Sequence, residues 1–365
     1  MKKALFVANT DNFHKNFHLP YIKRLQEKGY EVELVSTGDV DFTSVAKRHN
    51  IVFGRTPLKL QNIKAFCQLR KLLRNYYDII YFSTPVPGAV GRVALIGKKR
   101  GRVIYSAHGY SFYKGNPEGN GKYIFIEKNL CRLTDCTFTM NKEDYEAVME
   151  LKFPCKEIYN VDGVGIDTSV FYKCTQEEKS DLRKKYGYAD NTFIMIYPAE
   201  LTERKNQPLL FAALKELLKK HTNVKLLLAG TGIMMNSYKR IALDMNLNEY
   251  VEFLGYRNDV KDLLKASDVL FASSTNEGLP INIIEGLASG LPVVATATRG
   301  QTDLVIDGYN GFLFELNDAS NAASHICALI ENHDLYEKMA CNAIESVKKY
   351  DITNVIEQYD KVWGI

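Results

Sequence analysis

The sequence contains no long apolar run, and no stretch approaches the ~18 apolar residues that a membrane-spanning helix needs. The N-terminal lysines Lys2 and Lys3 precede only five apolar residues, Ala4–Ala8. This stretch is short for a signal peptide, so we interpret it as a buried first strand. The seven cysteines are odd in number and include no C-x-x-C pair. A disulfide framework or zinc ribbon is therefore excluded, and we expect reduced thiols in the cytoplasm.

The composition is that of a soluble globular protein of two domains: 365 residues, 46% apolar and 25% charged. It excludes disorder and collagen. The net charge of +4 is unevenly placed, because residues 1–170 carry +9 and residues 171–365 carry −5. This asymmetry indicates different partners for the two halves, although uneven surface charge without a function explains it equally well. We expect no nucleic acid partner.

Short, nearly continuous apolar runs alternate with longer amphipathic stretches, and a second series of this alternation begins halfway along the chain. Such runs are typical of parallel strands buried on both faces, so the sequence predicts an α/β protein with two doubly wound, Rossmann-like domains. The strands are expected at Lys3–Ala8, Glu31–Val35, Ile79–Phe82, Val103–Ala107, Cys136–Met140, Glu157–Val161, Thr192–Ala199, Lys225–Ala229, Val251–Gly255, Val269–Ala272, Val293–Thr296 and Gly311–Phe314.

A glycine-containing segment near residues 163–187 separates the two halves. We therefore expect an N-terminal domain over residues 1–170 and a C-terminal domain over residues 171–350. The remaining residues, 351–365, predict an amphipathic helix that packs back toward the N-terminal domain.

The most informative stretch runs from Glu277 to Pro292 and follows an expected strand. Pro280 suits the first position of a helix, so Glu277 falls in the loop before that helix and Glu285 inside it. The helix N-terminus, at Gly278, Leu279, Pro280 and Ile281, presents N–H groups and a positive dipole end to a phosphate. Glu285 can then accept two ribose hydroxyls, and Glu277 the hydroxyls of a sugar. A surface helix with ordinary glutamates is the simpler alternative.

This spacing resembles the E-x7-E motif of the retaining glycosyltransferases with the GT-B fold, family four (group 1). The resemblance covers nearly the whole chain and is similar to the capsule and exopolysaccharide subgroup. That similarity is carried by Phe17-His-Leu-Pro-Tyr21, Lys28–Leu34, Phe82-Ser-Thr-Pro85, Ser106–Lys114, Asn141–Asp144 and Gly163-Val-Gly-Ile-Asp167. It implies two Rossmann-like domains facing a central cleft, with the nucleotide sugar on the C-terminal domain and the acceptor on the N-terminal one.

The family places a histidine over the donor sugar, and His108 matches it in Ala-His-Gly after an expected strand. A core histidine with one backbone bond is the alternative. The family also has G-R-L followed by a lysine, which Lys205 matches, whereas the G-R pair reads Ala199-Glu200 here. We expect Arg204 to replace the missing arginine on the diphosphate. Equally, Glu200 could be a structural carboxylate that pairs with Arg204.

Two further turns are candidates for donor binding. Gly230 and Gly232 form a G-x-G after an expected strand, but residue 235 is methionine, so a dinucleotide fingerprint and NAD are not supported. Tyr256 or Arg257, after the next strand, could stack on the uracil base, although a plain turn fits as well.

The sequence predicts no metal site and no cofactor beyond the nucleotide sugar. Asp39-Val-Asp41 follows only the second strand and is interpreted as a turn. His14-x3-His18 has metal spacing but lacks an H-E-x-x-H carboxylate. We expect the segment around it to be an acceptor-side loop, with Asn16 and His18 as contacts.

Together these features predict a metal-independent hexosyltransferase that moves sugar, with retention, from a UDP-linked donor to a glycan or lipid-linked acceptor in surface polysaccharide synthesis. The alternatives are a hydrolysing UDP-sugar 2-epimerase and a non-catalytic sugar-nucleotide-binding partner subunit. The basic, leucine-bearing stretch Lys59–Arg74 suggests a cytoplasmic protein that lies peripherally on the anionic inner face of the plasma membrane. A solvated helix packed by its leucines is the alternative.

Overall fold

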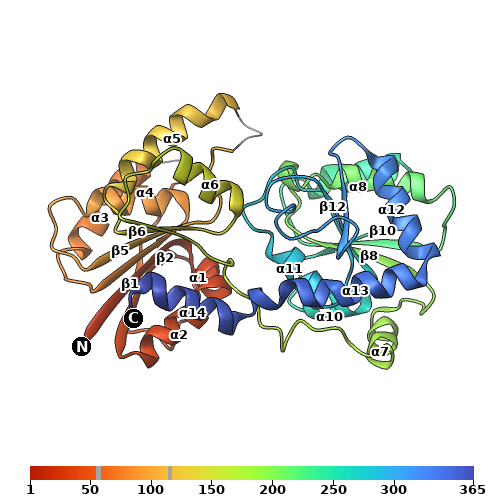
Figure 1. Ribbon diagram of the computed structural model, residues 1–365, viewed down its shortest axis with the longest axis horizontal. Helices are drawn as coiled ribbons and strands as arrows, with labels where there is room; N and C mark the ends of the chain where they lie inside the picture. The colour runs from red at the N-terminus through yellow and green to blue at the C-terminus, as the bar shows by residue number, and fades with distance from the viewer. Residues whose placement is uncertain (55–58, 114–116) are drawn as a thin grey trace. The chain divides into compact units, whose positions relative to one another are not determined.

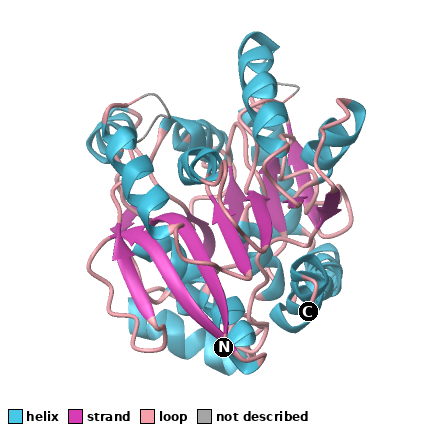
Figure 2. Cartoon of the chain, turned by 90° about the vertical axis from the view of Figure 1, so that its left-hand side faces the viewer, coloured by secondary structure: helices cyan, strands magenta, loops and turns pink. Residues whose placement is uncertain are grey.

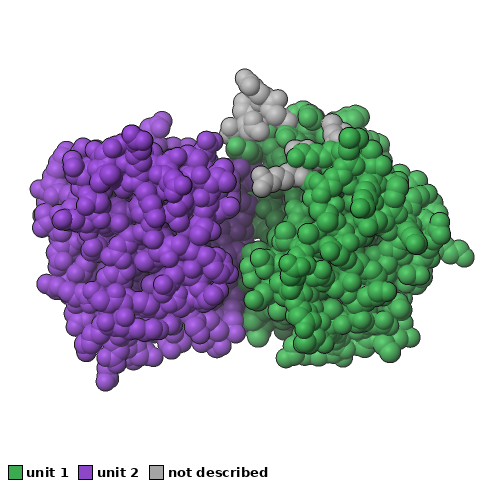
Figure 3. All heavy atoms as spheres, turned by 180° about the vertical axis from the view of Figure 1, so that it is seen from behind, with its two compact units in different colours: residues 1–165, 352–365 green, residues 166–351 purple. Residues whose placement is uncertain are grey.

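We describe the protein from a computed structural model, which describes residues 1–54, 59–113 and 117–365. Lys114, the last residue of the match over 106–114, lies outside the described residues. The chain divides into two compact units, coloured separately in Figure 3. Unit 1 comprises Met1–Gly165 and Ile352–Ile365, and unit 2 comprises Ile166–Asp351. The sequence predicted the division between residues 170 and 171, and in the structure it lies between residues 165 and 166.

Unit 1 is built on a seven-stranded sheet in the order β3-β2-β1-β4-β5-β6-β7, with every pairing parallel. Helices cover both faces of this sheet, as Figures 1 and 2 show. The strands are β1 (Lys2–Thr10), β2 (Tyr30–Thr37), β3 (Lys47–Asn50), β4 (Ile79–Ser83), β5 (Arg102–Ala107), β6 (Cys136–Thr139) and β7 (Glu157–Asn160). The helices are α1 (Asp11–Phe17), α2 (Leu19–Glu27), α3 (Gln61–Leu72), α4 (Pro85–Ala94), α5 (Pro117–Cys131), α6 (Lys142–Glu150) and α14 (Ile352–Trp363).

Helix α14 closes unit 1 although it comes from the end of the chain (Figure 1). Its Tyr359 stacks on Tyr21 of α2 with ring centroids 3.9 Å apart, and Asp360 pairs with Arg24 at 2.6 Å. The fully buried Trp363 adds a large apolar side chain to the same contact. Aromatic burial of this size is a substantial part of the energy that holds the helix in place.

Unit 2 has a six-stranded parallel sheet in the order β10-β9-β8-β11-β12-β13. Its strands are β8 (Phe193–Pro198), β9 (Val224–Ala229), β10 (Val251–Gly255), β11 (Val269–Ala272), β12 (Val293–Thr296) and β13 (Gly311–Phe314). Its helices are α7 (Gln176–Tyr186), α8 (Gln207–Leu217), α9 (Met235–Asp244), α10 (Val260–Ala266), α11 (Ile281–Ala288), α12 (Ala319–Glu331) and α13 (His333–Val347), with short 3-10 turns at Glu203–Lys205 and Lys348–Tyr350.

The strands form because their apolar runs are buried on both faces, as in Ala4–Ala8, where every side chain is inaccessible to solvent. The two parallel sheets confirm the predicted fold class of two Rossmann-like domains. In each unit the strand order reverses once, between β1 and β4 and between β8 and β11. Ligands of such folds bind outside the carboxyl ends of the strands at this switch point.

Candidate functional site

The switch point of unit 2 brings together the two loops that the sequence analysis singled out. The loop after β8 carries Arg204 and Lys205 in a 3-10 turn, and the loop after β11 carries Glu277. Backbone bonds join the loops, since the Thr275 N–H donates to the Arg204 carbonyl at 2.9 Å. The Ser273 hydroxyl likewise donates to the Lys205 carbonyl at 2.9 Å. The two segments, about 70 residues apart in sequence, thus form one surface.

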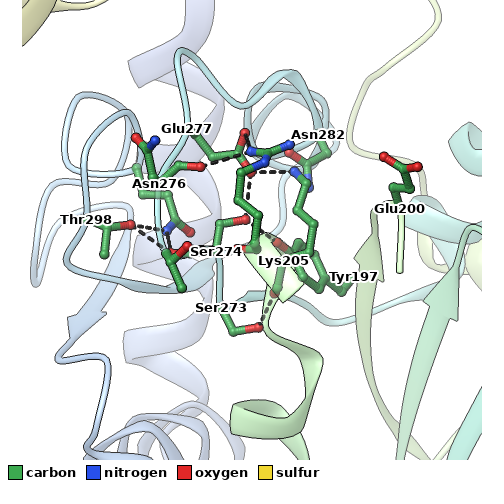
Figure 4. Close-up of polar contacts among 12 residues, drawn as sticks. Tyr197, Glu200, Lys205, Ser273, Ser274, Asn276, Glu277, Asn282 and Thr298 are labelled. Atoms are coloured by element: carbon green, nitrogen blue, oxygen red, sulfur yellow. Dashed lines mark hydrogen bonds and ion pairs between the residues drawn. The ribbon is translucent and has the colours of Figure 1, made fainter. Parts of the chain in front are cut away.

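Glu277 is the centre of a three-charge cluster (Figure 4). Its Oε1 lies 2.5 Å from Lys205 Nζ, and its Oε2 lies 2.5 Å from Arg204 Nη1. The Lys205 and Glu277 side chains are 12% and 10% exposed, whereas Arg204 is 47% exposed. One carboxylate therefore holds a buried ammonium and a solvent-facing guanidinium side by side, which leaves the cluster with a formal charge of +1.

Burial and charge act against each other on these groups. Burial would raise the pKa of Glu277, but Lys205 and Arg204 outweigh it and the pKa lies below its usual value. Burial lowers the pKa of Lys205, and Glu277 offsets part of that effect. The carboxylate is therefore ionised at neutral pH and offsets part of the cost of burying the ammonium.

Hydrogen bonds from neighbouring hydroxyl groups also hold the Glu277 carboxylate in place. The Ser274 hydroxyl donates to Oε1 at 2.6 Å, and the Tyr197 hydroxyl, 2.6 Å from Ser274 Oγ, donates to that oxygen in turn. The Ser274 carbonyl accepts from Gln301 Nε2 at 2.9 Å and from Thr298 Oγ1 at 2.8 Å. Sequence reasoning missed these supporting residues. The sequence did contain a signal for them, because the polar run 273–276 comes directly after a buried strand, where ligand-binding loops lie.

The E-x7-E stretch is placed as the sequence predicted, with Glu277 in the loop and Glu285 inside α11. Pro280 is the N-cap residue of α11, whereas the sequence predicted it at the first helical position, one residue later in the helix. Asn282 on the first turn donates to the Pro198 carbonyl at 3.0 Å, which ties the helix N-terminus to the end of β8. The backbone N–H groups of this first turn therefore face the same switch point as the two cations.

Glu285 differs from Glu277 in its surroundings. Among the described residues its carboxylate makes no hydrogen bond or ion pair, and burial raises its pKa to about 7. The side chain is half-buried, and a ligand with hydroxyl donors would supply partners for its carboxylate.

The structure corrects one alternative for Glu200. This residue is exposed, and Figure 4 shows its side chain directed away from the cluster. The expected alternative, a Glu200–Arg204 pair, is wrong because the Arg204 guanidinium pairs with Glu277 and also donates to the Asn276 carbonyl at 2.9 Å. Arg204 is thereby held beside Lys205.

The two glycines after β9 are required by packing. A Cβ at Gly230 would lie 2.0 Å from the Ala199 carbonyl oxygen, and one at Gly232 would lie 2.1 Å from that of Leu201. After β10, Tyr256 is 73% exposed, whereas Arg257 forms a two-pronged pair with Asp259 at 2.5 and 2.7 Å. Tyr256 is thus the freer of the two to stack on a ligand.

In unit 1, His108 follows β5 and is half-buried, with its Nε2 inaccessible to solvent. Its ring meets Phe13 edge-on with centroids 5.1 Å apart, and its Nε2 has no hydrogen-bond partner among the described residues. Burial lowers the pKa of His108 to about 4, so the imidazole is neutral at pH 7. A neutral ring nitrogen suits a sugar hydroxyl better than a phosphate.

The expected acceptor-side loop around Asn16 and His18 is wrong as a loop, because residues 11–17 form helix α1. Asn16 is exposed, but His18 is 1% exposed. Its Nδ1 lies 2.8 Å from His14 Nδ1, and its Nε2 lies 3.0 Å from Ser83 Oγ. Burial lowers the pKa of both histidines, so the pair is neutral and serves the core of unit 1 rather than an accessible surface.

Only some side chains of the basic stretch Lys59–Arg74 are accessible to a membrane surface. Arg70 donates to the carbonyls of Ala94 and Ile96 at 3.1 and 2.9 Å, so it caps the end of α4. Leu69 and Leu73 are buried in the core of unit 1. The exposed basic side chains are those of Lys59, Lys64, Lys71 and Arg74. Among the described residues, no helix combines the length and apolar character that crossing a bilayer requires.

Two parallel-sheet Rossmann-like units define the GT-B class of protein, and comparisons with known proteins agree. The model of the glycosyl transferases group 1 matches residues 178–346, and that of the glycosyl transferase 4-like family matches residues 3–140. The chain is 34% identical to EpsD of Bacillus subtilis (strain 168), named as a glycosyltransferase, over 100% of this chain and 96% of that protein.

Two further comparisons are more distant. An Escherichia coli UDP-Gal:alpha-D-GlcNAc-diphosphoundecaprenol alpha-1,3-galactosyltransferase is 28% identical over 83% of this chain and 79% of its own. The crystal structure of Anabaena HepE with UDP and glucose superposes on this chain with a TM-score of 0.83 at 22% identity. The match covers 100% of this chain and 100% of that chain. The chain therefore belongs to the group 1 glycosyltransferases of the GT-B fold.

Proposed function

We propose that this protein transfers a sugar from a UDP-linked donor to a lipid-linked or glycan acceptor in surface polysaccharide synthesis. The observation that carries the proposal is the Glu277–Lys205–Arg204 cluster at the switch point of unit 2. Two cations beside the first turn of α11 form a site for a diphosphate, and they are fixed before the ligand arrives. The UDP complexes of HepE support the choice of nucleotide.

The proposed roles follow the position of each side chain. Lys205, Arg204 and the N-terminus of α11 stabilise the negative charge that develops on the departing diphosphate. Such fixed charges usually supply the largest catalytic effect. Glu285 accepts the ribose hydroxyls, which would satisfy its unpaired carboxylate. Tyr256 lies free to stack on the base.

Glu277 has two tasks in this proposal. Without a ligand it neutralises Lys205 and Arg204, and with a donor bound it orients the sugar while the phosphates take over part of the contact with the cations. His108 of unit 1 presents a neutral ring nitrogen to a donor-sugar hydroxyl. Among the described residues we assign no nucleophile, so the acceptor attacks on the face that the diphosphate leaves, and the anomeric configuration is retained.

The reaction needs no bound metal in this proposal, since the cations and the helix N-terminus occupy the place that a divalent ion would take. Transfer should therefore persist in excess EDTA at a temperature well below unfolding. Complete loss that Mg²⁺ or Mn²⁺ restores would overturn this part.

The acceptor and the membrane form the second part of the proposal. The name of the E. coli relative states a diphosphoundecaprenol-linked acceptor for that protein. In this chain Lys64 and Lys71 are exposed on α3, and Arg74 is exposed just after its end. Leu60 and Ile63 at the start of the helix are 82% and 60% exposed. Cationic and apolar side chains on one helix suit a peripheral position on an anionic lipid surface.

A thermal-shift screen of UDP-, GDP- and ADP-sugars tests the donor, because a ligand that binds the folded protein raises Tm, and at equal concentration a tighter ligand raises it more. The stabilising donor is then incubated with and without a lipid-linked acceptor, and the products are identified. Transfer only with acceptor supports the proposal. Epimerised or hydrolysed sugar without acceptor would indicate the hydrolysing 2-epimerase, and no turnover would indicate a binding partner. Proton NMR of the product reports whether the configuration is retained.

A further inference from the structure

A second group of ligand-type side chains lies at the opposite edge of the unit 2 sheet from Glu277. His221 comes after α8 and shortly before β9 begins, so it is at the amino-terminal edge of the strands. Cys327 and Glu331 are one turn apart on α12 and share a face of that helix. One nitrogen, one sulfur and one oxygen from these residues all lie within 4.8 Å of one another. His221 Nε2 is 2.9 Å from a Glu331 oxygen.

The chemistry of this group indicates a metal of the zinc type. A thiolate, an imidazole and a carboxylate are the three ligand types that zinc takes in proteins, whereas calcium and magnesium prefer oxygen alone. In a tetrahedral zinc site the ligand atoms are about 3.3–3.8 Å apart, as follows from zinc–ligand bonds of about 2.0–2.3 Å. The observed cluster needs only a small inward movement, which the half-exposed Glu331 side chain can supply.

We propose that His221, Cys327 and Glu331 bind one Zn²⁺ ion, with water as the fourth ligand. The charges balance, because the thiolate and the carboxylate together neutralise the ion and the imidazole is neutral. Binding releases the proton of the Cys327 thiol. An ion pair between His221 and Glu331 and the packing of Cys327 in the core of unit 2 explain the positions separately, whereas a metal site explains why all three ligand atoms converge.

The ion would act as a clamp. It would join the segment after α8 to the last turns of α12, two elements that pack against each other. Since this cluster and the Glu277 cluster lie at opposite edges of the same sheet, the ion would stabilise unit 2 and leave sugar transfer unchanged. The inference does not depend on the proposed function, and neither does its test.

The experiment uses the full-length protein stripped with a chelator and then titrated with Zn²⁺ by calorimetry. We expect one site per chain and, at about 100-fold excess over Kd, a rise in Tm on the order of 5 °C. Co²⁺ in place of Zn²⁺ should give a sulfur-to-cobalt charge-transfer band.

Cys327→Ser and His221→Ala should each weaken Zn²⁺ binding by at least about 100-fold, and Cys341→Ser is the matched control that should bind as wild type. If Cys327→Ser does not fold, Glu331→Gln replaces it, because that side chain is 56% exposed and its loss costs little stability. Binding no tighter than millimolar, absence of the cobalt–sulfur band, or equal affinity in the ligand variants and the control would each overturn the proposal.

Discussion

The Oε1 of Glu277 lies 2.5 Å from the Nζ of Lys205, and both side chains are nearly buried. Arg204 completes the pair from the solvent side at the other oxygen. A carboxylate that neutralises two cations keeps them in place without a ligand. A diphosphate that reaches this switch point then meets donors whose positions are already set, so little reorganisation is needed as charge develops.

Glu277→Gln should slow transfer on the order of 10²-fold while the Kd for UDP changes little. The amide keeps an oxygen acceptor for Ser274 but removes the charge that orients the donor sugar and holds Lys205 and Arg204. Steady-state kinetics and calorimetry with UDP measure the two effects. Glu249→Gln is the matched control, because Glu249 is an exposed glutamate just before β10, at the opposite end of the strands from the cluster. Wild-type turnover in Glu277→Gln would contradict the assignment.

Lys205→Ala and Arg204→Ala should both lower kcat by about 10²–10³-fold, with smaller effects on donor KM, because each contact strengthens as the diphosphate leaves. The two side chains bind the same carboxylate, so we expect the double variant to lose less than the product of the single losses. Arg240→Ala, which removes an exposed arginine from α9 of the same unit, serves as the control. A silent Arg204→Ala would show that nothing replaces the family arginine at the Glu200 position.

Glu285 should make donor binding depend on pH. Burial raises its pKa to about 7 from an ordinary value of 4.5, so the folded protein holds an extra proton between these values. The free energy of unfolding therefore falls as pH rises from about 4.5 to about 7 and is level above that range. Ribose hydroxyls donate best to the ionised form, so donor affinity should rise with pH up to about 7, by at most about tenfold per pH unit.

Calorimetry with a UDP-sugar is the measurement, because its phosphates carry no group that titrates near pH 7, unlike the terminal phosphate of UDP. Glu285→Gln should bind more weakly and lose both the pH dependence of affinity and that of Tm. A wild-type affinity that is flat between pH 5.5 and 8 would remove Glu285 from the ribose site.

All strands of both sheets except β3 were predictable because their signal is local: a short apolar run between polar turns, such as Val269–Ala272. Glu277 and Glu285 were predictable for a related reason, since a strand, a proline and a helix stop fix where the intervening residues fall. The pairing of Glu277 with Lys205 and Arg204 was not. It depends on β8 and β11 becoming neighbours, which no feature within either segment specifies.

The misses have physical causes as well. Strand β3 reads Lys-Arg-His-Asn, and a polar edge strand has no apolar signature. It forms because it pairs with β2 and because Arg48 and His49 bond to Asp11 and Glu33 of other elements. His14 lies on α1 and His18 is the residue directly after that helix. The two bond to each other, and His18 also bonds to Ser83 of β4, a residue distant in sequence. Arg70 was predicted to face lipid. Its actual partners are carbonyls at the end of α4, and nothing in the sequence around Arg70 identifies them.

The membrane prediction is therefore restricted to the side chains that the structure leaves exposed. Lys64→Glu, Lys71→Glu and Arg74→Glu together should abolish co-sedimentation with vesicles rich in anionic lipid, while Arg70 stays unchanged because it caps α4. The matched control reverses Lys184, Lys215 and Lys261, three exposed lysines on helices of unit 2. It changes the net charge by the same amount at a different place.

Each basic side chain near an anionic surface contributes about 1 kcal/mol, and the attraction fades within a Debye length of about 10 Å at 0.1 M salt. Wild-type binding should therefore rise with the anionic lipid fraction and fall steeply as salt is added. Three reversals on one helix turn this attraction into repulsion, whereas the control triple should bind nearly as wild type if α3 is the contact. Both variants should retain donor affinity in the thermal-shift assay, since none of the six residues lies in the Glu277 cluster. Equal loss in both would mean that net charge alone drives binding. A wild-type protein that ignores anionic vesicles at low salt would favour a water-soluble acceptor.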